Sequence, residues 1–219
     1  GVLTSAERSK LKYNFKMYLG TTIGDICQLN FCDELFAYDT GEYTQNKKKT
    51  SQQEGYDMLG MAIEKYDPWD DKDKELYLGI KDYAADMYKN AYQGWKSLSM
   101  TAPVVAENTV KLKFDYIYCE GRTDGEDSLK FLEQKMKCPS LNRPKKDGTR
   151  SWRIPKPKTE PSWQQAMQQA VYWKATGQEP SLLFVTASGY HIANKENCQA
   201  LTEEKLLLKH SALLRRKEH

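Results

Sequence analysis

The chain has 219 residues, of which 39% are hydrophobic and 29% charged, and its formal net charge is +3. This composition is typical of a globular domain with a sizeable core, and it excludes a disordered or fibrous chain. Because no apolar run approaches the roughly 20 residues that span a bilayer and residues 1–10 lack the apolar centre of a secretory signal, we expect a cytoplasmic protein with no membrane partner.

Residues 1–100 are predicted to be mostly helical. A first helix is expected with Ser5 as its N-cap, and the apolar positions from Leu76 to Trp95 recur at helical spacing along one face. Pro68 interrupts the pattern and the acidic residues after it start a new helix. The predicted helices cover residues 5–18, 25–38, 53–66 and 76–95, with an exposed polar loop at 41–53.

From Thr101 onward, strand-forming residues become frequent. Three strands are predicted, and a turn at 121–128 makes the last two a hairpin. A helix ending at Gly177, two further strands and a helix capped by Thr202 follow. We therefore predict an α/β fold with a central mixed β-sheet flanked by helices, in which a helical portion (1–100) packs on a core (101–219) as one compact domain. The predicted elements cover 104–110, 111–118, 127–137 (strands), 138–161 (loop), 163–176 (helix), 181–187, 189–196 (strands) and 203–216 (helix).

The five cysteines are scattered and include no C-x-x-C pair. A reduced compartment with buried or idle thiols is the simplest interpretation. Four residues separate Cys27 from Cys32, which leaves a metal or iron–sulfur half-site as the alternative.

Basic side chains are concentrated in residues 135–158, which carry nine of them against a single acid, Asp147, for a net charge of +8. A concentrated basic segment beside acidic residues predicts a polyanionic partner, and a solvated loop is the alternative. The nine are Lys135, Lys137, Arg143, Lys145, Lys146, Arg150, Arg153, Lys156 and Lys158.

Two carboxylates and a lysine are predicted to meet at one end of the sheet. Glu133 and Lys135 lie two residues apart on a predicted strand, so they share a face, and the hairpin would bring Asp124 opposite them. Carboxylates and the Gln134 carbonyl are oxygen ligands suited to Mg²⁺, which phosphodiester hydrolysis uses to stabilise charge and activate water. Taken alone, E-x-K is more often an ordinary charge pair on a strand.

Three motifs in order resemble the RecB-like branch of the PD-(D/E)XK nuclease superfamily: G-x-x-D at 121–124, E-x-K at 133–135 and Q-x-x-x-Y at 168–172. The resemblance covers roughly residues 101–193. It implies a restriction-endonuclease-like core that hydrolyses DNA with Mg²⁺, or with Mn²⁺ in its place. By this resemblance Asp124 and Glu133 bind the metal, and Lys135 orients or deprotonates the attacking water. The resemblance also implies that Gln168 and Tyr172 lie near the catalytic centre and the DNA backbone, and that Glu107 is a polar residue at the sheet.

The helix at 163–176 places Gln164, Gln168 and Tyr172 on one stripe. Amides and a phenol facing a sheet edge suit phosphate and sugar contacts, and an uncharged solvent face is the alternative.

One family feature is missing. The branch often carries a histidine metal ligand on an early helix, but Gly60 stands at that place in GYDMLGMAIEKY. Glu64 is then the candidate acid near the metal, or else an ordinary solvated glutamate.

The segment after Lys135 resembles the small exonucleases of T7-like marine phages. This implies an exonuclease of phage DNA recombination or degradation in the host cytoplasm, with DNA as its partner. Phage replication or recombination proteins and a homo-oligomer are left open as further partners. The expected DNA-binding residues are Arg143, Lys145, Lys146, Arg150 and Arg153 along a channel, with Trp152 stacking on a base. A structure-specific endonuclease and a non-catalytic DNA-binding module remain as alternative functions.

Overall fold

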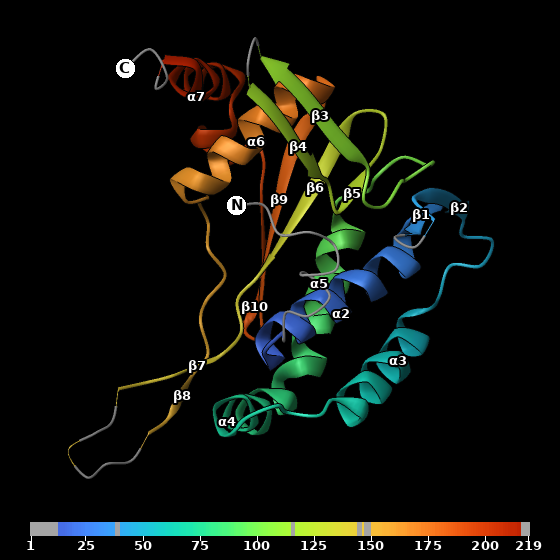
Figure 1. Cartoon of the computed structure of the whole chain (residues 1–219), viewed down its shortest axis with the longest axis vertical. Helices are drawn as coiled ribbons and strands as arrows, with labels where there is room; N and C mark the ends of the chain where they lie inside the picture. Colours follow the sequence, from blue (N-terminus) through green and yellow to red (C-terminus); the bar gives the residue numbers. More distant parts are fainter. Residues whose placement is uncertain (1–12, 38–39, 115–116, 144–145, 147–149, 216–219) are drawn as a thin grey trace.

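The computed structural model describes residues 13–37, 40–114, 117–143, 146 and 150–215. It has a mixed α/β structure in which a four-stranded sheet lies between two layers of helices (Figure 1). Two 3₁₀ turns, at Lys81–Tyr83 and Gln199–Leu201, accompany the helices. The helices are α2 (Phe15–Phe31), α3 (Gln52–Lys65), α4 (Asp71–Ile80), α5 (Ala84–Ser97), α6 (Trp163–Thr176) and α7 (Glu203–Arg215).

The central sheet has the strand order β10-β9-β6-β5. Strands β6 and β9 are parallel, whereas β5–β6 and β9–β10 are antiparallel, so the sheet is mixed, as predicted. The strands of this sheet are β5 (Gly125–Glu126), β6 (Lys130–Met136), β9 (Glu179–Thr186) and β10 (Gly189–Ala193). Three further antiparallel pairs are β1 (Glu34–Ala37) with β2 (Glu42–Gln45), β3 (Thr109–Phe114) with β4 (Ile117–Arg122), and β7 (Ser140–Leu141) with β8 (Trp152–Arg153).

Both faces of β9 are covered. Leu183 and Val185 join the hydrophobic cluster of α2 and α5, whereas Leu182 and Phe184 join the cluster of α6 and α7. Figure 1 shows these two pairs of helices on opposite sides of the sheet. Burial on both faces explains why this strand is a continuous apolar run rather than an alternating one.

The helical N-terminal part and the sheet share one core. Phe15 of α2, Tyr88 of α5 and Leu183 of β9 are all fully buried members of the same cluster. Helix α5 packs directly on β9 and β10. The parts before and after the boundary expected near residue 100 therefore do not have separate hydrophobic cores. No helix within the described residues combines the length and apolarity needed to cross a membrane.

Local sequence signals set the ends of the best-predicted helices. Helix α6 occupies the predicted residues, with a capping box between Ser162 and Gln165 and a C-cap at Gly177, whose φ of 72° suits glycine. Helix α3 has a second capping box, between Ser51 and Glu54. These interactions join residues close in the chain, which is why the sequence reveals them.

Two helical predictions were wrong. The helix expected at 25–38 ends at Phe31, and Glu34–Ala37 instead pairs with Glu42–Gln45, inside the expected loop. The helix expected at 76–95 is broken by the 3₁₀ turn, which lets α4 pack on α2 while α5 packs on the sheet. Ser5 lies outside the described residues, and the described helix begins at Phe15 with Asn14 as its N-cap.

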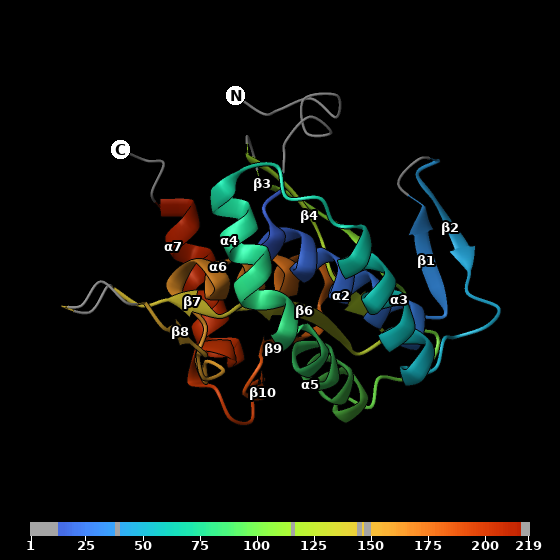
Figure 2. The same ribbon diagram turned by 90° about the horizontal axis from the view of Figure 1, so that it is seen from below.

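The strand predictions before Asp124 were also displaced. Residues 104–110 form isolated bridges at Val105 and only then enter β3, and residues 111–118 include the end of β3 and the start of β4. The hairpin expected between 111–118 and 127–137 was wrong: β4 pairs with β3, whereas β6 pairs with β5 and β9. The third strand starts at Lys130 because the Asp127 carboxylate accepts hydrogen bonds from Leu129 N and Lys130 N and holds a turn there. The expected loop at 138–161 contains β7 and β8, which form an arm that projects from the body of the molecule (Figure 2).

Candidate active site

Asp124 is fixed against the neighbouring strand by two hydrogen bonds. Its backbone N–H donates to Leu132 O at 2.9 Å, and Gln134 N donates to its Oδ2 atom at 2.5 Å. Asp124 immediately precedes β5, which pairs antiparallel with β6. The carboxylate therefore lies beside the E-x-K segment, as the sequence predicted.

Glu133 and Lys135 share one face of β6, and Lys135 Nζ lies 2.5 Å from Glu133 Oε2. Helix α6 covers this face: Gln168 Nε2 donates to Glu133 Oε1 at 3.3 Å and to Tyr172 Oη at 3.1 Å. Glu133 is only 3% exposed. Four of the predicted site residues thus meet in one hydrogen-bonded chain.

The carboxylates of this site resist ionisation. Burial, and then the charge of Glu133, raises the pKa of Asp124 well above its usual value. Burial also raises the pKa of Glu133, although Lys135 opposes that rise. Burial alone would lower the pKa of Lys135, but the charge and hydrogen bond of Glu133 outweigh it, so the pKa is raised and Lys135 stays a cation. A cation bound beside these crowded, desolvated carboxylates would lower both pKa values and favour the ionised forms.

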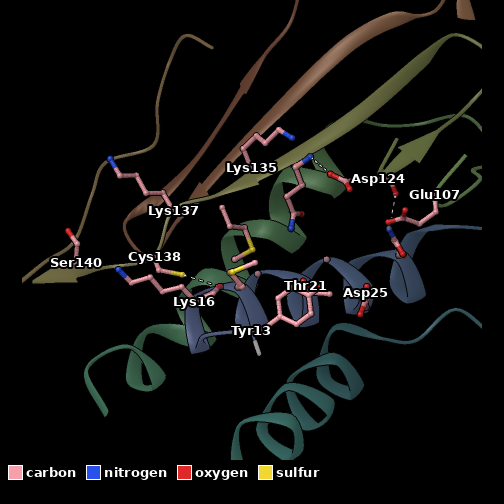
Figure 3. Close-up of a pocket in the computed structure, with 16 residues that line it drawn as sticks. Tyr13, Lys16, Thr21, Asp25, Glu107, Asp124, Lys135, Lys137, Cys138 and Ser140 are labelled. Carbon is pink, nitrogen blue, oxygen red and sulfur yellow. Dashed lines mark hydrogen bonds between the residues drawn. The ribbon is translucent and has the colours of Figure 1, made fainter. Parts of the chain in front are cut away.

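A groove of about 1240 Å³ runs between α2 and the C-terminal half of β6. Figure 3 shows Asp25, Glu107 and Asp124 at one end of this groove and Lys16 and Lys137 at the other. The groove therefore combines an acidic end, suited to a metal ion, with a basic end, suited to phosphate.

Helix α2 supplies groove residues that the sequence analysis missed. Gln28 Nε2 donates to Glu107 Oε1 at 3.1 Å and to Asp124 O at 3.2 Å, which ties the helix to the acidic end. Burial, and then the charge of Glu107, raises the pKa of Asp25 to about 6. The sequence feature that could have pointed to α2 is Gln28, a polar residue that follows the apolar Ile26 and Cys27. The structure shows that all three are buried.

Glu107 was expected as a polar residue at the sheet, and it does line the groove next to Asp124. Its φ of 54° is unusual for a residue with a side chain. Tyr43 Oη donates to Glu107 O at 3.1 Å, so contacts from both α2 and β2 fix this residue.

Glu64 does not lie at the site. It is exposed on α3 and is not among the residues that line the groove. The helical acid of the groove is Asp25 on α2, because α2 rather than α3 runs along the open end of β6. The Gln134 side chain also lines the groove, where its Oε1 accepts a hydrogen bond from Trp95 Nε1 at 2.8 Å.

The residues fit a hard cation that keeps several waters. Within the described part of the chain, no three or more His, Cys, Asp or Glu side chains gather closely enough to enclose a metal ion. Asp124 and Glu133 offer two carboxylates, a ligand number that suits Mg²⁺ better than an all-protein cage would. Cys27 and Cys32 are buried free thiols, and burial raises the pKa of both, that of Cys32 to about 12, which disfavours the thiolate that a metal half-site needs.

The expected base-stacking role of Trp152 conflicts with its position. The indole packs against Gly79 of α4, where an added methyl group would meet the ring at 1.8 Å. The Nη1 atom of Arg150 lies 3.9 Å from Oε1 of Glu75, which is on the same helix α4. Trp152 therefore anchors the base of the arm, and the part of the ring that packs on Gly79 is not free to stack on a base.

The described members of the remaining DNA-binding set lie on the arm and do not meet the carboxylates. Arg143, Lys146 and Arg153 are exposed, and Lys145 lies outside the described residues. Gln164, the first member of the polar stripe on α6, is also exposed. The arm thus presents cations to solvent beside the groove.

Comparison with protein-family models, with curated proteins and with solved structures finds no match.

Proposed function

We propose that the chain is a metal-dependent DNA nuclease that hydrolyses phosphodiester bonds, and that it acts as an exonuclease. The strongest support is the 2.5 Å hydrogen bond from Gln134 N to Asp124 Oδ2, which places that carboxylate beside the Glu133–Lys135 pair. An isolated charge pair on a strand would need neither this second carboxylate nor the Gln168–Tyr172 contact above it.

Each residue has a distinct role in the proposed reaction. Asp124 and Glu133 hold Mg²⁺, or Mn²⁺ in its place, and the metal when bound polarises the phosphate and lowers the pKa of water. Lys135 orients the attacking water and offsets phosphate charge, a role that its raised pKa favours over that of a base. Gln168 holds Glu133 in place, and with Tyr172 it positions the DNA backbone.

The fold is compatible with a PD-(D/E)XK core of the RecB-like type, which we propose for β5, β6, α6 and β9. Asp124 directly precedes β5, the strand next to β6 with its E-x-K pair, and the Q-x-x-x-Y helix contacts Glu133 through Gln168. The five free cysteines are compatible with a reducing cytoplasm. Phage DNA recombination or degradation, with phage proteins as further partners, is part of the same proposal.

The proposal is tested by incubating end-labelled linear DNA and covalently closed circular DNA with Mg²⁺ or Mn²⁺. The wild type is compared with Lys135→Ala and with Lys89→Ala, a control that removes an exposed lysine of α5. We expect digestion of linear DNA only, a loss of about 10²- to 10⁴-fold in Lys135→Ala, and no change in the control.

Cleavage of the circular DNA would instead favour a structure-specific endonuclease, because an exonuclease requires an end. If no protein cuts either substrate with either metal while all bind DNA, the nuclease proposal is wrong and the chain is a DNA-binding module.

A further inference from the structure

A second cavity, of about 200 Å³, adjoins the groove and shares Lys135, Met136 and Lys137 with it. Two more lysines, Lys156 and Lys158, complete a lining that contains four lysines and no acidic residue. The other lining residues are Gln165, Phe184, Val185 and Thr186. This composition distinguishes the cavity from the groove, which mixes both signs of charge.

The positive charge of the cavity is largely uncompensated. Across the described residues, no ion pair involves Lys137, Lys156 or Lys158, and only Lys135 has a carboxylate partner, Glu133. The polar groups around the lysines are already engaged: Gln165 Oε1 accepts from Ser162 N, and Thr186 Oγ1 donates to Gly189 O. The ammonium groups and the Gln165 Nε2 amide are therefore the donors left for a ligand, and like charges held together favour an anion.

The backbone holds two of these lysines in place. Lys156 and Lys158 alternate with Pro155 and Pro157, and proline fixes its own φ and keeps the preceding residue extended. Both lysine side chains border the same cavity. Pro155 is buried, and Ser188 Oγ donates to its carbonyl at 2.8 Å. This pre-ordering lowers the entropy lost when a ligand binds.

We propose that the four-lysine cavity is a phosphate-binding subsite that holds a phosphate of the DNA strand next to the scissile one. This inference rests on the proposed function, because Lys135 belongs both to the cavity and to the site of Asp124 and Glu133. A phosphate bound by Lys156 and Lys158 places the neighbouring phosphodiester at the carboxylates. Terminal and internal phosphates share this chemistry, so the experiment separates them.

The test measures equilibrium binding in EDTA, where no cleavage occurs, with a short single-stranded oligonucleotide labelled at an internal base. The double variant Lys156→Gln/Lys158→Gln is compared with Lys89→Gln/Lys96→Gln, which removes two exposed lysines of α5 on the far side of the sheet. We expect the cavity variant to bind about tenfold more weakly, with a slope of log K against log salt that is smaller by about one to two. Wild-type binding by the cavity variant, or equal weakening by the control pair, overturns the proposal.

Three oligonucleotides identify the phosphate: one with a 5′-phosphate, one with a 3′-phosphate and one with neither. If the wild type prefers one phosphorylated end and the cavity variant loses that preference, the subsite holds a terminal phosphate. If the variant weakens all three equally, the subsite holds an internal phosphate. Thermal unfolding of both double variants checks that the fold is intact.

The two proposals fail separately. A protein that shows the cavity effect in EDTA but never cuts DNA retains the subsite and loses the nuclease function. A protein that cuts DNA but shows no cavity effect retains the nuclease function and loses the subsite.

Discussion

The backbone N–H of Gln134 donates a 2.5 Å hydrogen bond to Oδ2 of Asp124. This bond lowers the pKa of Asp124, whereas burial and the charge of Glu133 raise it more strongly. The carboxylate is thus held in one orientation against β6 although its ionised form is disfavoured there. Such a compromise is expected where a charge is kept for chemistry and not for stability.

Asp124→Asn should abolish cleavage and stabilise the fold. The amide oxygen keeps a hydrogen-bond acceptor for Gln134 N, while the repulsion of Glu133 disappears. We expect cleavage to fall by about 10³-fold or more and the melting temperature in EDTA at pH 7.5 to rise. Asp82→Asn, at an exposed position, should change neither. A fall in melting temperature for Asp124→Asn would contradict the repulsion argument.

Mg²⁺ should stabilise the wild type by binding only the folded state. At about 100 times its dissociation constant, a ligand adds about 2.7 kcal/mol, which corresponds to a rise of about 5 °C or more in melting temperature for a chain of this size. Asp124→Asn and Glu133→Gln should lose this rise, because each removes one of the two proposed metal ligands. Differential scanning fluorimetry at matched ionic strength measures it. A rise retained by both variants would show that Mg²⁺ binds elsewhere.

Asp25 should make stability fall as the pH rises. Its pKa in the folded protein is raised from 3.8 to about 6, so the folded state binds the proton more tightly than the unfolded chain. Protonated Asp25 therefore adds to the free energy of unfolding below about pH 4, and this contribution is lost as the pH rises through about 6.

The check is a melting series of wild type and Asp25→Asn in EDTA. The melting temperature of the variant should rise relative to that of the wild type between these pH values, by only about 1–2 °C because Asp25 borders an open groove in which water screens its charge. A melting difference that does not change with pH would show that Asp25 is not perturbed.

Tyr172→Phe should slow cleavage and destabilise the protein only slightly. The ring packs edge-on against Phe131 with centroids 5.8 Å apart, and that contact survives the substitution. The hydroxyl is lost, which accepts from Gln168 Nε2 and from the backbone N–H of Arg122. We expect a decrease of about 5-fold in kcat and a melting temperature lowered by no more than about 2–4 °C. Tyr190→Phe, on the far strand β10, is the matched control, and equal losses in both variants would exclude a specific role.

Trp152→Ala should destabilise the protein more than it weakens DNA binding. The indole fills the space beside Gly79 and packs against the main core. Its removal should cost about 2–3 kcal/mol, less than for a fully buried tryptophan. Chemical denaturation measures this loss, and binding to single-stranded DNA in EDTA should stay within about twofold of wild type. A large loss of binding at unchanged stability would restore the stacking role.

Short-range patterns determined a large part of this structure. The capping box at Ser162 and the glycine after Thr176 set the limits of α6, because both involve residues within one helical turn. Strand alternation predicted that Glu133 and Lys135 share a face, and they do. The strand predictions between Val104 and Tyr118 were displaced because alternation does not mark where a chain turns back on itself.

The amino-acid sequence alone determined the mixed α/β class and the shared face of Glu133 and Lys135, because helix signals and strand alternation act over a few residues. Asp124 does lie beside this pair, but through the short strand β5 and not through the predicted hairpin. Only the tertiary structure decided which helix completes the site. Gln28 reaches Asp124 across 96 positions of the chain, and no local pattern favours Asp25 over Glu64. It likewise decided that Trp152 packs on α4 and that Lys156 and Lys158 join Lys135 around one cavity. Such contacts follow from how whole elements pack together, a property of the folded chain and of no single segment.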